Sequence, residues 1–384
     1  MPAGTISCAD KIMKKALIFY ISRHSGHFHA ASAIEQGLVS VLGNIEVDKI
    51  NAFSYTNPIL EKVINKAYMQ VIKKRPEIWG NIYDNPEFMK KTSKAREAIH
   101  KFNMSKVRKL IDAHDPDVVL CTQAFPCGMV ADYKRSIGKD TPLIGVLTDH
   151  APHSYWLYDE VDYYIVPSEE TGETLIKKGV PSKKVKAYGI PVDPKFSVGL
   201  DREDVKERLK LEGDAPVILI MGGSQGIGAM EVVVRSLLSD EEHNYRLVVV
   251  TGTNKKLYSK LKKLEKKKTG GRLMTMTYVK NIEELMEVSD VIISKPGGMT
   301  IAESMVKRLP LIIVDPIPGH ERLNTDYLVR KGVAVEIKNI DAIHQSMNEL
   351  FDAKGVIDGM KIAAGKIARP DSALNIAKLV KDIL

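Results

Sequence analysis

The sequence predicts an α/β protein built from two doubly wound domains that face a cleft. Short apolar runs alternate with segments of helical periodicity, a pattern typical of parallel β-α-β units. A strand, a glycine turn and a helix open each half of the chain, near Lys15 and again near Val217. A break with two prolines and two glycines separates the halves at 189–200. We therefore expect one domain over 1–195 and a second over 196–384.

The N-terminal domain is expected to begin with a strand at 15–22. After the glycine turn, Ala30, Ile34 and Leu38 recur on one face of a helix. Further strands are expected at 45–50, 117–121, 142–147, 161–166 and 185–188.

The C-terminal domain repeats the pattern, with strands expected at 217–221, 246–250, 273–278, 290–294, 311–315 and 333–337. The last segment, about 370–384, has the periodicity of an amphipathic helix and is a candidate to pack back on the N-terminal domain. Ligands of doubly wound sheets bind outside the carboxyl ends of the strands, so both glycine turns would face the cleft.

Composition places the chain among globular proteins, with 44% hydrophobic and 27% charged residues. No apolar run is long enough for a transmembrane helix, and the first ten residues lack the pattern of a signal peptide. Cys8, Cys121 and Cys127 lack the spacing of zinc ligands and are expected to be reduced thiols. We expect a peripheral protein on the cytoplasmic face of a membrane.

The stretch 61–110 is strongly basic, with thirteen lysines or arginines against five acidic residues. It also carries aromatic and apolar side chains, a mixture that suits an anionic lipid surface. A solvated helical face is the simpler alternative, and nucleic acid fits less well because no recognised binding motif accompanies the charge. The expected acceptor or membrane residues are Tyr68, Lys73, Lys74, Arg75, Trp79, Tyr83, His153 and Trp156.

His27 is the candidate general base. It follows Gly26 where the first helix begins, and the helix dipole there favours a neutral imidazole, which can accept a proton near pH 7. His24 and His29 are rivals, and three neighbouring histidines could also suggest a metal. Their spacing is not that of a helical zinc site and no carboxylate lies beside them, so we expect no metal.

Asp149 follows another expected strand at the same cleft. It could orient a histidine or bind an acceptor hydroxyl, with loop capping as the alternative.

Three segments of the C-terminal domain predict a nucleotide-sugar site. The turn 222–228 follows a strand and precedes a helix, which suits phosphate, but it is neither the dinucleotide nor the Walker motif. Glu303 lies in the first turns of a later helix, where a carboxylate can bind two ribose hydroxyls or simply stabilise the helix dipole. Glu321 and Asn324 lie on one side of another helix start and suit sugar hydroxyls, unless they only cap it.

These segments together resemble the family of the processive diacylglycerol glucosyltransferases of bacteria and the monogalactosyldiacylglycerol synthases of plants, and more distantly the peptidoglycan N-acetylglucosaminyltransferase. The resemblance covers nearly the whole chain from Lys15. It is carried by Gly26-His27-x-x-Ala30-Ala31, 51–58, 79–83, Thr148-Asp149, 222–226, 295–300 and 318–321. Many members have glutamine where this chain has His320.

The resemblance implies a GT-B fold, with the acceptor on the N-terminal domain and a UDP-sugar on the C-terminal domain. It implies that His27 is the base, that Glu303 binds ribose and that Tyr278 and Val279 meet the uracil. Ser224, Gln225, Gly298 and Thr300 would hold the diphosphate, while Glu321 and Asn324 would face the sugar. The expected donor site is completed by Gly26, Gly223, Thr251, Gly297, Met299, Gly319 and His320.

The expected function is inverting transfer of glucose or galactose from UDP-glucose or UDP-galactose to a hydroxyl of diacylglycerol or a glycosyl-diacylglycerol, without cofactor or metal. The one D-x-D string, Asp115-Pro116-Asp117, leads into a strand and is interpreted as the turn before it. Two alternatives remain, a UDP-sugar epimerase of the same fold and a non-catalytic module that senses UDP-sugars.

Overall fold

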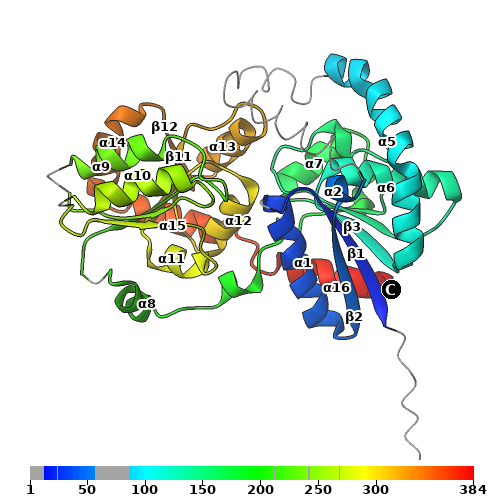
Figure 1. Ribbon diagram of the computed structural model, residues 1–384, viewed down its shortest axis with the longest axis horizontal. Coiled ribbons are helices and arrows are strands. Elements are labelled where there is room, and N and C mark those ends of the chain that lie inside the picture. Colours follow the sequence, from blue (N-terminus) through cyan, green and yellow to red (C-terminus); the bar gives the residue numbers. More distant parts are fainter. Residues whose placement is uncertain (1–12, 24, 57–85, 212, 241–242, 268) are drawn as a thin grey trace, which may run out of the picture.

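The computed structural model describes residues 13–23, 25–56, 86–211, 213–240, 243–267 and 269–384. It has two α/β domains, each built on a six-stranded parallel sheet with helices on both faces (Figure 1). The predicted fold class is confirmed, and every predicted strand is present, in several cases shortened by one or more residues.

The N-terminal sheet has the strand order β2-β1-β3-β4-β5-β6. Its strands are β1 (Lys14–Tyr20), β2 (Ile45–Asn51), β3 (Val118–Cys121), β4 (Leu143–Val146), β5 (Tyr163–Ile165) and β6 (Val185–Lys186). Its helices are α1 (Gly26–Leu42), α2 (Ala52–Thr56), α5 (Pro86–His114), α6 (Ala124–Ile137) and α7 (Glu169–Lys177), with short 3-10 turns η1 (Ser154–Trp156) and η2 (Ser182–Lys184).

The C-terminal sheet has the order β12-β11-β10-β7-β8-β9. Its strands are β7 (Val217–Met221), β8 (Arg246–Val250), β9 (Leu273–Met276), β10 (Val291–Ser294), β11 (Leu311–Val314) and β12 (Ala334–Ile337). The helices after the first domain are α8 (Arg202–Leu209), α9 (Met230–Leu238), α10 (Lys255–Glu265), α11 (Ile282–Val288), α12 (Gly298–Val306), α13 (His320–Arg330), α14 (Ile343–Asp352), α15 (Val356–Ile367) and α16 (Ser372–Ile383), with η3 (Pro194–Ser197) and η4 (Ile340–Ala342).

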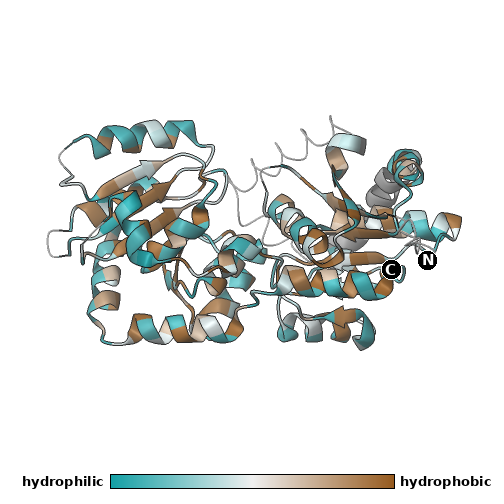
Figure 2. Cartoon of the chain, turned by 90° about the horizontal axis from the view of Figure 1, so that it is seen from below, coloured by the Kyte–Doolittle hydropathy of each residue, from teal (hydrophilic) through white to brown (hydrophobic). Residues whose placement is uncertain are grey.

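Strand β1 shows why these runs are apolar throughout. Leu17 and Phe19 join a buried cluster on one face of the sheet, and Ala16 and Ile18 join a cluster on the other. A parallel sheet covered by helices on both faces needs apolar side chains at every position, not at alternate ones. Figure 2 shows the hydrophobic strands inside each domain and the hydrophilic faces of the helices outside.

The last helix, α16, lies against α1 of the N-terminal domain (Figure 1). Its Ile376 and Val380 are fully buried in the same cluster as Ile34. A Cβ at Gly37 would lie 2.5 Å from the carbonyl oxygen of Ala373, so only glycine permits this close approach. The chain therefore passes between the domains twice.

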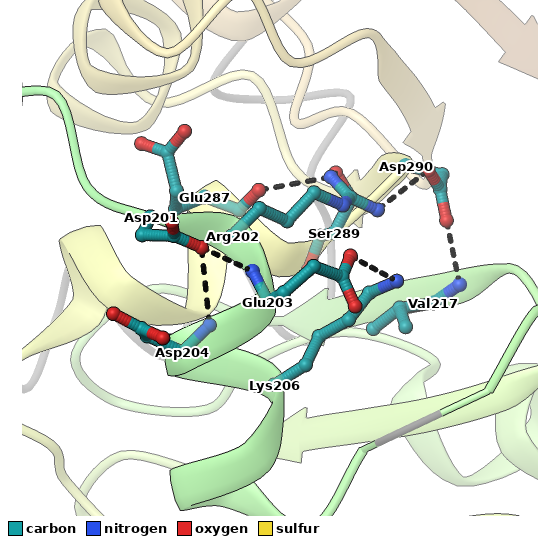
Figure 3. A network of polar contacts seen from close by, with 9 residues as sticks. All are labelled: Asp201, Arg202, Glu203, Asp204, Lys206, Val217, Glu287, Ser289 and Asp290. Carbon is teal, nitrogen blue, oxygen red and sulfur yellow. Dashed lines mark hydrogen bonds and ion pairs between the residues drawn. The ribbon is translucent and has the colours of Figure 1, made fainter.

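Arg202 fixes the start of α8 to the C-terminal sheet (Figure 3). Its guanidinium donates to the carbonyl oxygens of Glu287 at 2.9 Å and Ser289 at 3.3 Å, and to the carboxylate of Asp290 at 2.8 Å. The other carboxylate oxygen of Asp290 accepts from the backbone N–H of Val217 at 2.8 Å. The segment that follows the first crossing is thus held at the amino ends of β7 and β10.

Candidate functional site

The two domains meet at the amino ends of α1 and α12. A Cβ at Gly298 would lie only 1.6 Å from the carbonyl oxygen of Thr148, in the loop after β4. A Cβ at Gly26 would lie 3.0 Å from Cγ of Met299. Gly298 is required because its backbone lies against the backbone of the other domain, whereas Gly26 packs against the side chain of Met299. The junction therefore brings the predicted base region and the predicted phosphate region together.

The hydrogen bonding of His27 fixes its neutral tautomer. Its Nδ1 lies 2.7 Å from the carbonyl oxygen of Thr122 and 3.3 Å from Oγ1 of Thr148. A carbonyl oxygen can only accept, so Nδ1 carries the proton and Nε2 carries the free electron pair. This is the tautomer that a general base acting through Nε2 needs.

The pKa of His27 is lowered, chiefly because burial disfavours the charged imidazolium. The carboxylate of Asp149 and the hydrogen bond to the carbonyl of Thr122 raise this pKa, and the electrostatic interaction with His320 lowers it further. Because the net effect is a lowered pKa, His27 is neutral at pH 7. Asp149 and His320 are both close enough to interact electrostatically with its imidazole.

Thr122 is a site residue that sequence reasoning missed. Its hydroxyl donates to the carbonyl oxygen of His27 at 3.0 Å while its own carbonyl accepts from the imidazole. The signal was available, because Thr122 is a polar residue directly after β3, and β3 is paired with β1. Carboxyl ends of neighbouring parallel strands meet at one edge of the sheet.

The position of Asn324 differs from the one expected, in which its side chain faces the sugar. Its side chain is fully buried in α13 and its amide donates to Oδ1 of Asp149 at 3.1 Å and to the carbonyl oxygen of Pro296 at 2.9 Å. Its oxygen accepts from the backbone N–H of His150 at 2.9 Å. The amide therefore joins the two domains, and both of its N–H donors are used within the protein.

The glycine turn after β7 is a tight turn. Gly223 and Gly226 have φ values of 64° and 57°, a left-handed conformation that favours glycine. The turn is closed by the N–H of Ile227, which donates to the carbonyl oxygen of Gly222 at 2.9 Å. Ser224 is half-buried and its carbonyl accepts from Thr253, whereas Gly223 and Gln225 are exposed.

The amino end of α12 supplies the second part of the expected phosphate site. Gly297 precedes the helix in an extended conformation, and Gly298 begins it. Thr300 is buried in the first turn, and Met299 contacts Gly26 of the other domain. Unpaired N–H groups at a helix start favour an anion.

Glu303 lies one turn further along α12, and burial raises its pKa to about 8. Lys195 lowers this pKa, while the carboxylates of Asp193 and Glu283 raise it. Lys195, which sequence reasoning missed, also donates to the carbonyl oxygen of Lys280 at 2.7 Å and pairs with Glu283 at 2.8 Å. Lys195, which lies where the chain first passes from one domain to the other, is thus close to the expected nucleoside site.

The residues expected around the uracil, Tyr278 and Val279, directly precede Lys280 in the chain. Tyr278 is exposed and Val279 is half-buried against the hydrophobic core of the domain. Thr251 is different, because its buried hydroxyl donates to the carbonyl oxygen of Met276 at 3.0 Å. Thr251 therefore stabilises the end of β8 and does not offer its hydroxyl to a donor.

The start of α13 holds the remaining donor residues. Gly319 has a φ of 94°, which a residue with a side chain rarely adopts. Glu321 is buried and accepts from the backbone N–H of Ile317 at 2.7 Å, and burial raises its pKa. His320 is half-buried beside it.

The expected acceptor residues divide into two groups. Tyr68, Lys73, Lys74, Arg75, Trp79 and Tyr83 lie outside the described residues, as does His24. Trp156 was wrongly expected on an acceptor or membrane surface, since it is only 6% exposed and belongs to the N-terminal core. Gly145 leaves the space that its ring fills. The Nδ1 of His153 accepts from the backbone N–H of Tyr155 at 3.2 Å and so caps η1.

Among the described residues, no group of three or more histidine, cysteine, aspartate or glutamate side chains could hold a metal ion. Asp117 of the D-x-D string accepts from the backbone N–H of Lys15 at 2.8 Å, which ties β3 to the beginning of β1. That is the end of the sheet remote from His27. No helix in the described ranges has the length and apolar character to cross a membrane.

Comparisons with known proteins assign the family. Residues 27–192 match the family model of monogalactosyldiacylglycerol (MGDG) synthase, and residues 217–368 match that of the glycosyltransferase family 28 C-terminal domain. The chain is therefore a glycosyltransferase that is similar to these two families over most of its length. The two matches coincide with the two domains of the structure, apart from the termini and the segment between them.

Individual relatives agree with this assignment. The glycosyltransferase is 28% identical over 367 residues to the processive diacylglycerol beta-glucosyltransferase of Bacillus cytotoxicus, covering 95% of this chain and 93% of the relative. Its fold matches MurG of Acinetobacter baumannii with a TM-score of 0.64 at 15% identity, covering 96% and 99% of the two chains.

A third comparison has the same fold and another named activity. UDP-GlcNAc 2-epimerase of Neisseria meningitidis, bound to UDP-GlcNAc, matches with a TM-score of 0.62 at 14% identity and covers 96% of this chain and 98% of its own. The GT-B fold is therefore confirmed, but the fold by itself does not separate transfer from epimerisation.

Proposed function

We propose that this glycosyltransferase transfers a hexose from a UDP-sugar to a hydroxyl of diacylglycerol or a glycosyl-diacylglycerol, with inversion at the anomeric carbon. The observation that carries the proposal is the state of His27. Its Nδ1 proton is committed to Thr122, which leaves Nε2 as the basic nitrogen, and Gly26 beside it contacts the helix start of the donor domain. The names of the sequence relatives supply the substrate class.

The reaction needs one proton acceptor and one site for the leaving group. The acceptor oxygen forms a bond to the anomeric carbon while Nε2 of His27 takes its proton. The bond between the anomeric carbon and the β-phosphate oxygen breaks, and its electron pair stays on UDP. The glycine turn 222–228 and the start of α12 are the candidate anion site for that charge. A single displacement inverts the configuration.

Glucose and galactose are the proposed donors, because the matching relative is a glucosyltransferase and the matching family model is an MGDG synthase. His320 lies beside the buried Glu321 at the start of α13, and its electrostatic interaction lowers the pKa of both His27 and Glu321. We propose that His320 and Glu321 contact the sugar. They replace the expected pair of Glu321 and Asn324.

We propose that the enzyme binds to an anionic membrane surface and takes its lipid acceptor from that membrane. Helix α5 belongs to the basic stretch and exposes 67% of Phe102, with Lys109 exposed on the same helix two turns later. An exposed aromatic ring among lysines suits the interface between headgroups and acyl chains. This supports a peripheral position on the membrane.

Epimerisation is the second candidate, because an epimerase that binds UDP-GlcNAc shares the fold. The two activities differ in what they consume. A transferase needs a lipid hydroxyl and leaves a glycolipid, whereas an epimerase converts the nucleotide sugar without any acceptor. A sensor would do neither.

The decisive experiment incubates the full chain with a panel of UDP-sugars, with and without vesicles that contain diacylglycerol, and identifies the products by mass spectrometry. We expect UDP and a hexosyl-diacylglycerol, formed only when UDP-glucose or UDP-galactose and the lipid are both present. Conversion of a UDP-sugar without lipid would favour epimerisation. Binding of a UDP-sugar without any product would favour a sensor.

A further inference from the structure

Lys295 is a largely buried cation between two segments that are expected to bind the donor, the glycine turn 222–228 and the start of α12. It follows β10 and precedes the start of α12, and its side chain is 13% exposed. Its Cε lies 3.1 Å from the position that a Cβ would take at Gly228. The aliphatic part of the side chain therefore runs across the glycine turn, which keeps the ammonium close to the backbone of that turn.

The ammonium of Lys295 has only a loose anionic partner in the described structure. It lies 3.7 Å from Oδ2 of Asp315, which is longer than a charge-assisted hydrogen bond. The side chain of Asp315 is itself 55% exposed, so much of its charge is screened by water. The positive charge of Lys295 also lowers the pKa of Glu321, which places it near the start of α13.

A lysine that is largely removed from water without a close anion loses hydration energy. Three features around this one can hold an anion: the glycine turn after β7, the amino end of α12 and the ammonium itself. A diphosphate spans two phosphate groups and can contact all three. The loop is also held in place, because the amide of Asn324 binds the carbonyl oxygen of Pro296 at 2.9 Å.

We propose that the ammonium of Lys295 binds the diphosphate of the nucleotide donor and stabilises the charge that develops on it when the sugar leaves. This inference rests on the proposed function, since it concerns the same donor. When the bond between the anomeric carbon and the phosphate oxygen breaks, UDP gains one negative charge. Lys295 keeps its proton and interacts with that charge, while the proton of the acceptor goes to His27.

The test compares the binding of UDP and of uridine to the full chain by titration calorimetry. In the wild type we expect UDP to bind much more tightly than uridine. Lys295→Met should weaken UDP binding by about 10- to 100-fold, while uridine binding stays within about twofold. Lys295→Arg should retain most of the preference for UDP, because it keeps the charge.

Lys256→Met is the matched control. Lys256 is an exposed lysine that, like Gly226 and Gly228, lines a cavity of about 270 Å³ on the side of the glycine turn next to α10. Removing its charge should leave the affinity for UDP within about twofold of the wild type. An equal loss from Lys256→Met and Lys295→Met would mean that general electrostatics, not a contact of Lys295, holds the nucleotide, and would overturn the inference.

The remaining outcomes separate this inference from the proposed function. If the wild type binds UDP and Lys295→Met binds it equally well, Lys295 does not contact the diphosphate and only the inference fails. If Lys295→Met loses uridine together with UDP while Lys295→Arg also loses the preference for UDP, the role is structural and the inference fails again. If the wild type binds no UDP, the proposed function is wrong, and the inference about Lys295 is wrong as well because it rests on that function.

Discussion

The amide of Asn324 donates a hydrogen bond of 3.1 Å to the carboxylate of Asp149, and this contact joins the two domains beside His27. It belongs to a larger surface of α13. The ring of Tyr327 stacks on His150 with centroids 3.9 Å apart, and Arg330 forms an ion pair with Glu170. One face of α13 thus holds the N-terminal domain, while the first turn of the same helix carries the proposed sugar-binding residues.

The first prediction concerns this contact. Asn324→Ala should remove the partner of three polar groups, namely the part-buried N–H of His150, the buried carbonyl of Pro296 and one part-buried oxygen of Asp149. We expect kcat/KM to fall by about 10- to 100-fold and the free energy of unfolding to fall by about 1–3 kcal/mol. Steady-state kinetics and urea unfolding measure the two quantities.

Asn339→Ala is the control for that variant, because Asn339 is an exposed residue of the same domain whose side chain makes no capping hydrogen bond at η4. It should leave both quantities unchanged. Wild-type kcat/KM in Asn324→Ala would show that the contact between Asn324 and Asp149 is not needed for a productive arrangement of the domains.

The second prediction concerns pH. The pKa of His27 lies below its ordinary value of 6.5, so kcat at a saturating donor concentration should rise with pH through a value below 6.5 and then level off, as expected for a base that must be neutral. The carboxylate of Asp149 raises this pKa. Asp149→Asn should therefore move the acid limb of the pH profile to still lower pH. A shift to higher pH would contradict the assignment of the limb to His27.

The third prediction concerns Glu303, whose pKa is raised to about 8 by burial. A carboxyl that must be ionised to accept two ribose hydroxyls has to lose its proton first. UDP affinity should therefore increase by up to about tenfold between pH 7 and pH 9, and binding should release a proton. Calorimetry in buffers of different ionisation enthalpy measures the release.

Glu303→Gln provides the comparison, because its amide does not titrate. Its affinity for UDP should be weaker and should not vary across the same pH range. A wild-type affinity that is equally flat would indicate that Glu303 does not bind the ribose as a carboxylate.

The fourth prediction concerns the membrane. Phe102→Ser removes an exposed aromatic ring from α5 and should weaken binding to vesicles with anionic lipid by about tenfold in a flotation assay. Ile362→Ser is the matched control, because Ile362 is 62% exposed but lies on α15 of the other domain. If both variants float with vesicles as well as the wild type does, α5 is not part of the membrane-binding surface.

The sequence was sufficient for those features that depend on local pattern. The strands were found because parallel strands covered on both faces are apolar at consecutive positions, as β1 is from Ala16 to Tyr20. His27 and the glycine turn after β7 were found because a strand, a glycine and a helix occur in direct succession.

Features that depend on contacts between distant segments could not be predicted in the same way. Asn324 was expected to face the sugar, but its partners lie in the loop after β4 of the other domain. Trp156 looked like an interfacial aromatic until Gly145 provided the space that buries it. The position of Thr122 directly after β3 places it near His27, which is 95 residues away in the sequence, but the contact itself is made by a backbone carbonyl, and no side-chain pattern predicts that contact.

The most direct test of the central claim measures hexose transfer by His27→Ala. The rate of glycolipid formation is followed with the donor accepted by the wild type and diacylglycerol vesicles, and UDP binding is measured in parallel. If Nε2 of His27 is the general base, kcat should fall by about 10²- to 10⁴-fold while UDP affinity stays within about twofold. Glycolipid formation at close to the wild-type rate, with UDP still bound, would contradict the claim.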